Sequence, residues 1–164
     1  MSRTIKIPMT IEVDVQYAAD FPDLPDEKQF RYWVETALKD LKDNAELTIR
    51  IVDEAEGTEL NEQWRKSKGP TNVLSFSNEG VSEIAPDLLG DIVICAPVVA
   101  REAKEQNKNS QSHWAHMVIH GVLHLTGFDH IDPEDADRME SLEINILEKL
   151  NYKNPYLSTQ PLTT

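Results

Sequence analysis

The feature of this sequence that most constrains its fold is an apolar segment that also carries four histidines. Residues 111–125 are predicted to form a helix, and its four histidines fall three, four and four residues apart, near one helical face: His113, His116, His120 and His124. The rest of the segment is unusually apolar, with Trp114, Met117, Val118, Ile119, Val122, Leu123 and Leu125. Such a helix is expected to be buried and to hold its histidines rigidly.

The spacing limits how many of these histidines can bind one metal ion. His116 and His124 are eight residues apart, which is about 12 Å along a helix, whereas a Zn–N bond is about 2.1 Å long. Two neighbouring histidines can share an ion, so a third ligand must come from chain that has turned back. Gly127 permits this turn, because glycine readily adopts the left-handed conformation that ends a helix, and His130 then returns toward the pair.

The pattern formed by His120, His124, Gly127 and His130 is the one that metzincin proteases use for three zinc ligands. Three neutral imidazoles leave the fourth position of a zinc ion open, as in catalytic sites, and a water molecule bound there becomes a nucleophile. We therefore predict one Zn²⁺ per chain on His120, His124 and His130, with Ni²⁺ or Cu²⁺ able to substitute. The other two helix histidines are expected to support the site, to be structural or to face solvent.

The residue after the first ligand separates two classes of metal hydrolase. In the protease motif H-E-x-x-H this residue is the glutamate that acts as general base, whereas here it is Gly121, which cannot move a proton. RNA is less demanding, because it carries its own 2′-OH and stabilisation of charge by a metal and a cation can suffice. Gly121 therefore argues against proteolysis, although the histidine spacing alone keeps a zinc metalloprotease as the alternative.

The remaining elements predict one α+β domain over residues 1–164, a small sheet of about four strands packed against helices. The period of two predicts strands at 4–15, 45–53, 72–76 and 90–96, the last being continuously apolar and therefore buried on both faces. Further helices are predicted at 27–42, 54–66, 97–107 and 133–150. Asp26 and Asp132 are the expected N-caps of the first and last of these, and Leu41 the last residue of the first apolar stripe.

Composition and charge bear on compartment and partners. No apolar run approaches the roughly 18 residues of a membrane helix, and residues 1–17 lack the apolar core of a signal peptide. The single cysteine, Cys95, suits a reducing compartment, so we expect a cytoplasmic protein with no membrane partner. The net charge of −13 argues against non-specific binding to nucleic acid, and we expect no DNA partner. An RNA substrate would require a local basic patch or a guiding protein.

Three ordered blocks of the sequence resemble the YbeY endoribonuclease family of bacteria. "HGVLHLTGFDH" (120–130), preceded by "HWAHMVI", looks like the family signature. "LNEQWRKSKGPTNVLSFS" (60–77) and "LLGDIVIC" (88–95) resemble the other two blocks in the expected order, and "MESLE" (139–143) and "NPYL" (154–157) also match. The resemblance covers about residues 46–157.

The resemblance implies a single-strand-specific metal-dependent endoribonuclease that acts in maturing the 3′ end of 16S ribosomal RNA and in late quality control of 70S ribosomes. The implied partners are single-stranded RNA, the rRNA precursor and the ribosome. Its zinc ligands fall on His120, His124 and His130, and its functionally important arginine falls on Arg65. Asn72 stands where a common variant has Asp, which leaves the role of this side chain open.

Arg65 also suits phosphate chemistry on its own. A guanidinium is always charged and can contact a phosphate in a bidentate manner, and with Lys66 and Lys68 it forms the densest positive cluster of an acidic chain. The alternative is a solvated helix end that favours the C-terminal dipole. We predict that Arg65 is catalytic and that Arg65, Lys66 and Lys68 bind substrate. A third class, a non-catalytic ribosome-assembly factor with a structural metal, would apply if RNA processing did not need the histidines.

Overall fold

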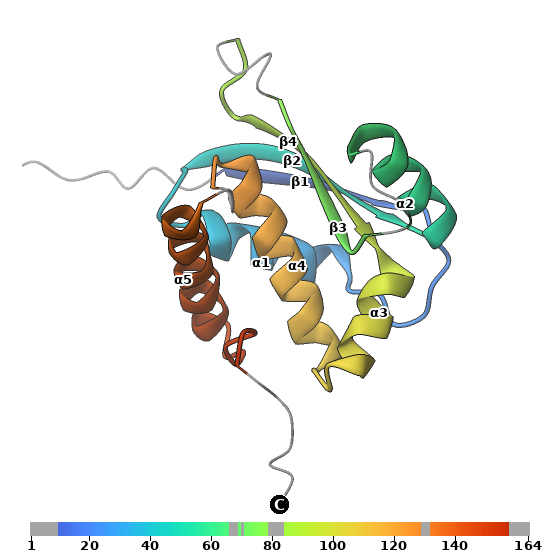
Figure 1. Cartoon of the computed structure of the whole chain (residues 1–164). Coiled ribbons are helices and arrows are strands. Elements are labelled where there is room, and N and C mark those ends of the chain that lie inside the picture. Colours follow the sequence, from blue (N-terminus) through green and yellow to red (C-terminus); the bar gives the residue numbers. More distant parts are fainter. Residues whose placement is uncertain (1–9, 66–68, 70, 79–83, 129–131, 158–164) are drawn as a thin grey trace, which may run out of the picture.

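The computed structural model describes residues 10–65, 69, 71–78, 84–128 and 132–157. Within them lies a four-stranded sheet of order β1-β2-β4-β3, drawn in Figure 1. Its strands are β1 (Thr10–Tyr17), β2 (Asn44–Val52), β3 (Val73–Ser77) and β4 (Leu88–Cys95). β1, β2 and β4 run parallel, and β3 pairs antiparallel with β4 and forms one edge of the sheet. The predicted α+β class with a small four-stranded sheet is confirmed.

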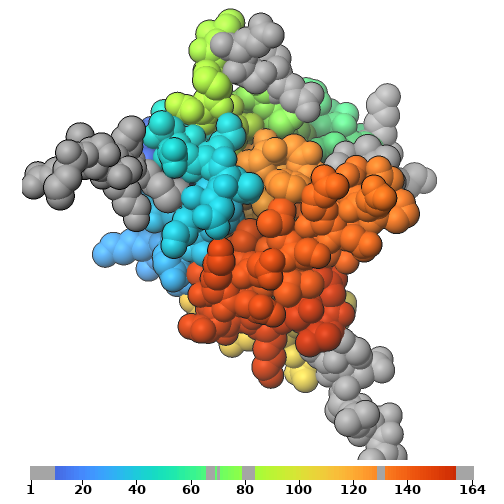
Figure 2. Space-filling model, turned by 90° about the vertical axis from the view of Figure 1, so that its left-hand side faces the viewer, coloured from blue at the N-terminus to red at the C-terminus, as the bar shows by residue number. Residues whose placement is uncertain are grey.

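The helices cover both faces of this sheet. They are α1 (Glu27–Leu38), α2 (Glu54–Leu60) with a following π-helical turn (Asn61–Arg65), α3 (Ala96–Glu105), α4 (Ser110–Leu125) and α5 (Pro133–Lys149). α1 and α4 pack together against one face, and α2 lies on the other (Figure 1). α5 packs against α4 and forms much of the surface turned to the viewer in Figure 2. In the described part of the chain, none of these helices has the length and apolarity to cross a bilayer.

The predicted N-caps are confirmed, whereas the predicted end of the first helix is wrong. Asp26 accepts from the amide of Gln29 at 2.8 Å, and Asp132 accepts from the amide of Asp135 at 2.9 Å. α1 stops at Leu38 rather than at residue 42, because the Leu38 carbonyl accepts from the amides of residues 41 and 42 in a turn. Leu41 is consequently 38% exposed and does not continue the apolar stripe.

The helix predicted at 54–66 is α-helical only as far as Leu60. It continues as a π-helical turn, where the side chain of buried Asn61 donates to the carbonyl of Gly69 at 2.8 Å. The strand predicted at 4–15 is described only from Thr10 and runs on to Tyr17. Its first six residues, 4–9, lie outside the described part of the chain.

α4 is the interior helix that the sequence predicts. It packs against β3, β4, α1, α3 and α5, and its buried residues include Trp114, Val118, Ile119 and Val122. At Gly121 the helix approaches the sheet so closely that a Cβ atom would lie 2.8 Å from Cγ2 of Ile92 in β4. This close contact fixes the distance of α4 from the sheet, and therefore the position of the histidines beside Gly121.

Candidate active site

The chain reverses direction directly after α4, as the glycine predicts. Gly127 has a φ angle of 105°, and the amide of Phe128 donates to the carbonyl of Leu123 at 3.0 Å, which is the bond that closes a glycine-terminated helix. His130, the predicted third metal ligand, lies outside the described residues, as do Lys66 and Lys68. The structure therefore places two of the predicted metal ligands and one of the predicted cationic residues.

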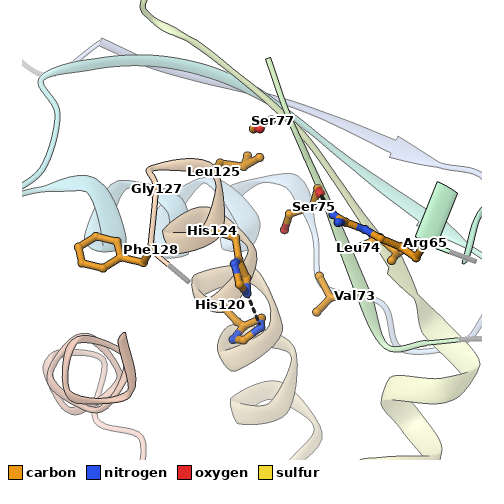
Figure 3. A pocket seen from close by; sticks show the side chains of 10 residues that line it. All are labelled: Arg65, Val73, Leu74, Ser75, Ser77, His120, His124, Leu125, Gly127 and Phe128. Atoms are coloured by element: carbon orange, nitrogen blue, oxygen red, sulfur yellow. Dashed lines mark hydrogen bonds between the residues drawn. The ribbon is translucent and has the colours of Figure 1, made fainter. Parts of the chain in front are cut away.

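His120 and His124 turn the same ring nitrogen toward each other. Their Nε2 atoms are 3.1 Å apart. Two nitrogen ligands of a tetrahedral zinc ion, each about 2.1 Å from the metal, are about 3.4 Å apart. Both rings line a cavity of about 360 Å³ whose wall also includes Arg65, Ser75 and Phe128 (Figure 3). The donor type, the separation and the access from the cavity all fit one shared zinc-class ion.

Arg65 is held on the wall of this cavity by strand β3. Its Nη2 group donates to the carbonyl of Ser75, and its Cζ atom lies 5.7 Å from the centroid of the Phe76 ring. Trp64, which is 61% exposed, meets the same ring edge-on. A guanidinium has five N–H donors, so the bond to Ser75 leaves others for a substrate. Figure 3 shows the guanidinium at β3 on one side of the two imidazoles and Phe128 on the other.

The other two histidines of α4 are buried and bonded to carboxylates. Nε2 of His113 lies 3.0 Å from Oε1 of Glu102 in α3, and burial lowers the pKa of His113 although Glu102 opposes this. Nε2 of His116 bonds to Oε2 of Glu143 in α5. Of the roles expected for these histidines, exposure to solvent is wrong.

The structure also gives Asn72 a role that the sequence left open. Its Nδ2 group donates to both carboxylate oxygens of Glu102, at 3.1 and 3.2 Å, and its Oδ1 accepts from the amide of Val73 at 2.7 Å. Asn72 therefore orients the carboxylate that bonds His113.

Glu143 is the residue of this region that the sequence reasoning missed. Its side chain is fully buried and bonds His116, Nδ1 of His120 at 3.2 Å and the hydroxyl of Tyr156, which donates at 2.7 Å. Burial alone raises the pKa of Glu143, but the hydrogen bonds with the two histidines outweigh burial and hold this pKa far below its usual range. Ligand atoms of His116, His120 and Glu143 all lie within 4.8 Å of one another, so this cluster could also hold a metal ion.

A sequence signal for Glu143 was present in the spacing of α5. Met139, Glu143, Ile146 and Leu147 recur at helical spacing and are all buried, so a glutamate stands in the apolar stripe of the helix. A carboxylate at such a position needs a hydrogen-bonding partner in the core.

The comparison with known sequences decides the family. A profile of the family described as Endoribonuclease YbeY matches residues 14–151. The chain belongs to the YbeY endoribonuclease family. Two YbeY endoribonucleases of Coxiella burnetii, from strains Dugway 5J108-111 and RSA 493, are each 50% identical over 149 residues, which cover 89% of this chain and 98% of theirs. The solution structure of TM1509 from Thermotoga maritima shares the fold, with a TM-score of 0.55 at 24% identity over 92% of this chain and 99% of that one.

Membership of the YbeY family supports an endoribonuclease activity, and hence RNA as the substrate. The surroundings of Gly121 agree with this assignment. The position of its missing Cβ faces Ile92 of the sheet, and its carbonyl accepts from Oγ of Ser75 at 3.3 Å. A protease-type glutamate at this position would place its Cβ against the side chain of Ile92, which would have to shift, so the catalytic base of peptide hydrolysis is missing from a position with no free room for a side chain.

Proposed function

We propose that this protein is a zinc-dependent, single-strand-specific endoribonuclease of the cytoplasm that matures the 3′ end of 16S rRNA and acts in late quality control of 70S ribosomes. The observation that carries the proposal is the cavity in which the Nε2 atoms of His120 and His124 lie 3.1 Å apart and which Arg65 also lines. An imidazole pair and a guanidinium around one cavity suit hydrolysis of a phosphodiester. His130 is proposed as the third zinc ligand.

In this mechanism the chain positions the phosphate and stabilises its developing charge. His120, His124 and His130 would hold the zinc ion, which when bound would supply a Lewis acid and a water of lowered pKa. Arg65, fixed by Ser75 and Phe76, donates to the non-bridging oxygens, on which negative charge grows as phosphorus is attacked. We assign substrate binding to Arg65, Lys66 and Lys68.

The shape of the site favours unpaired RNA. The cavity lies between α4 and the edge strand β3, has a volume of about 360 Å³ and has the histidines as part of its lining. A stacked duplex presents its phosphates on a wide, stiff cylinder, whereas a single strand can bend its backbone into such a cavity.

We infer from the net charge that protein contacts on the ribosome supplement weak binding of RNA. The chain carries a net charge of −13, and the proposed substrate cations are three. Single-stranded nucleic acid loses about 0.7 counterions per neutralised phosphate, so three contacts predict a slope of about −2 for log K against log salt. A much steeper slope for naked RNA would show that the site makes many more phosphate contacts.

One experiment tests this function against both alternatives. Purified protein is incubated with single-stranded RNA, duplex RNA and casein, with and without a chelator. We expect cleavage of the single strand alone, lost with chelator and restored by Zn²⁺. Chelator-sensitive cleavage of casein would indicate a metalloprotease. If a His124→Ala variant cleaves no RNA yet restores rRNA maturation in cells that lack the protein, the chain is a non-catalytic assembly factor.

A further inference from the structure

Glu143 is an unusual carboxylate because it is completely buried and is hydrogen-bonded to two histidines and a tyrosine rather than to a lysine or an arginine. Oε1 bonds Nδ1 of His120 at 3.2 Å, and Oε2 bonds Nε2 of His116 and accepts from the Tyr156 hydroxyl at 2.7 Å. Burying a carboxylate is costly unless hydrogen bonds compensate for the lost water. Such a group in an otherwise apolar helix stripe is therefore expected to have a role besides packing.

The contacts of His120 indicate the role of Glu143. The two nitrogens of its ring face different groups: Nδ1 faces Glu143, and Nε2 faces Nε2 of His124, 3.1 Å away, beside the cavity. A carboxylate oxygen accepts, so we assign the proton of this 3.2 Å bond to Nδ1 of His120. In the neutral ring Nε2 then presents its lone pair, which is the form that binds a metal.

We propose that Glu143 is the positioning residue of the metal centre: it fixes the tautomer and the ring orientation of His120, and Tyr156 and His116 hold its carboxylate in place. This inference rests on the proposed function only in taking His120 and His124 as metal ligands. It joins the segment after α5, through Tyr156, to the centre on α4. The carboxylate touches no substrate, so its role is positional rather than catalytic.

The cluster of His116, His120 and Glu143 could alternatively bind the ion itself. The hydrogen bonds argue for positioning. Both oxygens of Glu143 already bond the two histidines and Tyr156, and an ion would have to replace these bonds. Glu143 is also 0% exposed, so an ion among these groups would have little room for the water or substrate that a catalytic metal needs.

The test measures zinc affinity and the ligating nitrogen, without reference to RNA cleavage. Zinc affinity is obtained by competition with a chromogenic chelator, and ¹⁵N chemical shifts of zinc-loaded, histidine-labelled protein identify the bound nitrogen of each ring. We expect Zn²⁺ on Nε2 of His120 and Nε2 of His124, with Nδ1 of His120 protonated. Glu143→Gln should weaken zinc binding about 10- to 100-fold, the usual effect of losing a carboxylate behind a ligand.

A matched variant separates positioning from stability. Glu102→Gln alters the carboxylate that bonds His113 on the same helix, and it should cost stability without changing zinc affinity. Tyr156→Phe should weaken zinc binding less than Glu143→Gln, because it removes one support of the carboxylate and leaves the bond to His120. Equal zinc affinities for Glu143→Gln and the parent would overturn the proposal.

The alternative cluster and a failure of the proposed function give different results. Zinc on Nδ1 of His120, or loss of zinc from His116→Ala but not from His124→Ala, would make Glu143 a direct ligand and overturn positioning. The nitrogen assignment uses the parent protein, so it stands even if Glu143→Gln does not fold. A protein that shows the expected zinc data but cleaves no RNA would refute the proposed function alone.

Discussion

The two halves of α4 carry the same side chain in two different environments. In the first half, His113 and His116 are buried, and each bonds a carboxylate from a neighbouring helix. In the second half, His120 and His124 direct their Nε2 atoms toward each other beside a cavity. All four follow one helical face, so the difference comes from what packs against the helix.

In the proposed metal centre, the partners of each histidine, rather than the spacing, determine which histidines face the ion. The Nε2 atoms of the first pair are used by Glu102 and Glu143, whereas those of the second pair meet each other. His120 belongs to both environments, since its other nitrogen bonds Glu143. In the proposed mechanism, the buried half supports the metal centre and the open half holds the ion.

The largest expected effect comes from removing a histidine of the open half. His124→Ala should lose most of the bound zinc, since one of the three proposed ligands is gone, and RNA cleavage with it. His113→Gln, a change in the buried half, should retain zinc close to one ion per chain. Metal analysis by inductively coupled plasma mass spectrometry measures both, and similar losses in the two variants would remove the distinction between the halves.

Arg65 tests whether the open half works together with β3. Arg65→Ala should slow cleavage about 10²- to 10³-fold, the usual effect of removing one group that stabilises transition-state charge, while zinc content stays unchanged. Arg65→Lys should recover only part of the rate, because an ammonium keeps the charge but loses the planar fork. Single-turnover kinetics on a short RNA measures these rates.

Arg31 is the matched control, an exposed arginine of α1 that does not line the cavity. Arg31→Ala should cleave at the parental rate. If Arg65→Ala also cleaves at that rate, Arg65 is a surface charge and the proposed role in catalysis is wrong.

Gly121 lies next to the boundary between the two halves and sets the distance of α4 from the sheet. Gly121→Ala should lower the free energy of unfolding by about 1–3 kcal/mol, because the new methyl group would overpack the core against Ile92. In a double-mutant cycle with Ile92→Ala, the added methyl should be better tolerated. Urea unfolding of the zinc-free protein measures both effects.

Gly57→Ala in α2 is the control, since its Cβ would lie 3.2 Å from Sγ of Cys95 rather than 2.8 Å from a neighbour. It should cost less than Gly121→Ala. A Gly121→Ala variant as stable as the parent would show that α4 can move away from the sheet.

The smallest expected effect concerns the pH dependence of the buried half. Burial lowers the pKa of His113 in the folded protein below its ordinary value of 6.5, although Glu102 opposes this. The unfolded chain therefore takes up the proton more readily, and the free energy of unfolding should fall as the pH drops below 6.5. His113→Gln should make this fall shallower between pH 6.5 and 5.5 in urea unfolding of the zinc-free protein. An unchanged pH dependence would show that His113 is not the titrating group.

Much of the fold follows from local patterns in the sequence. Asp26, Asp132 and Gly127 mark the helix ends that the structure shows, because capping and reversal depend on a few neighbouring atoms. The end of α1 and the π-helical turn at Asn61–Arg65 were not predictable in this way. The turn accompanies a bond from Asn61 to Gly69, and no local period encodes such a contact.

The candidate site divides along the same line. The H-x-x-x-H spacing brings His120 and His124 together, since both lie on one helix. Glu143 in α5 is 23 residues from His120, and Tyr156 in the segment after α5 is 13 residues from Glu143. These hydrogen bonds therefore depend on tertiary packing. His130 lies outside the described residues, so its place as third ligand stays a prediction.

The exposed Trp64 gives this protein an optical property of its own. Of the three tryptophans, Trp33 and Trp114 are 0% and 3% exposed, whereas Trp64 is 61% exposed. Trp64 packs against the ring of Phe76, over which the guanidinium of Arg65 also lies. Buried indoles emit at shorter wavelengths and are shielded from aqueous quenchers, so the red edge of the emission and its quenching by acrylamide report mainly on Trp64. Emission at the red edge therefore reports on the residue that directly precedes Arg65 of the cavity wall, and the protein needs no added label.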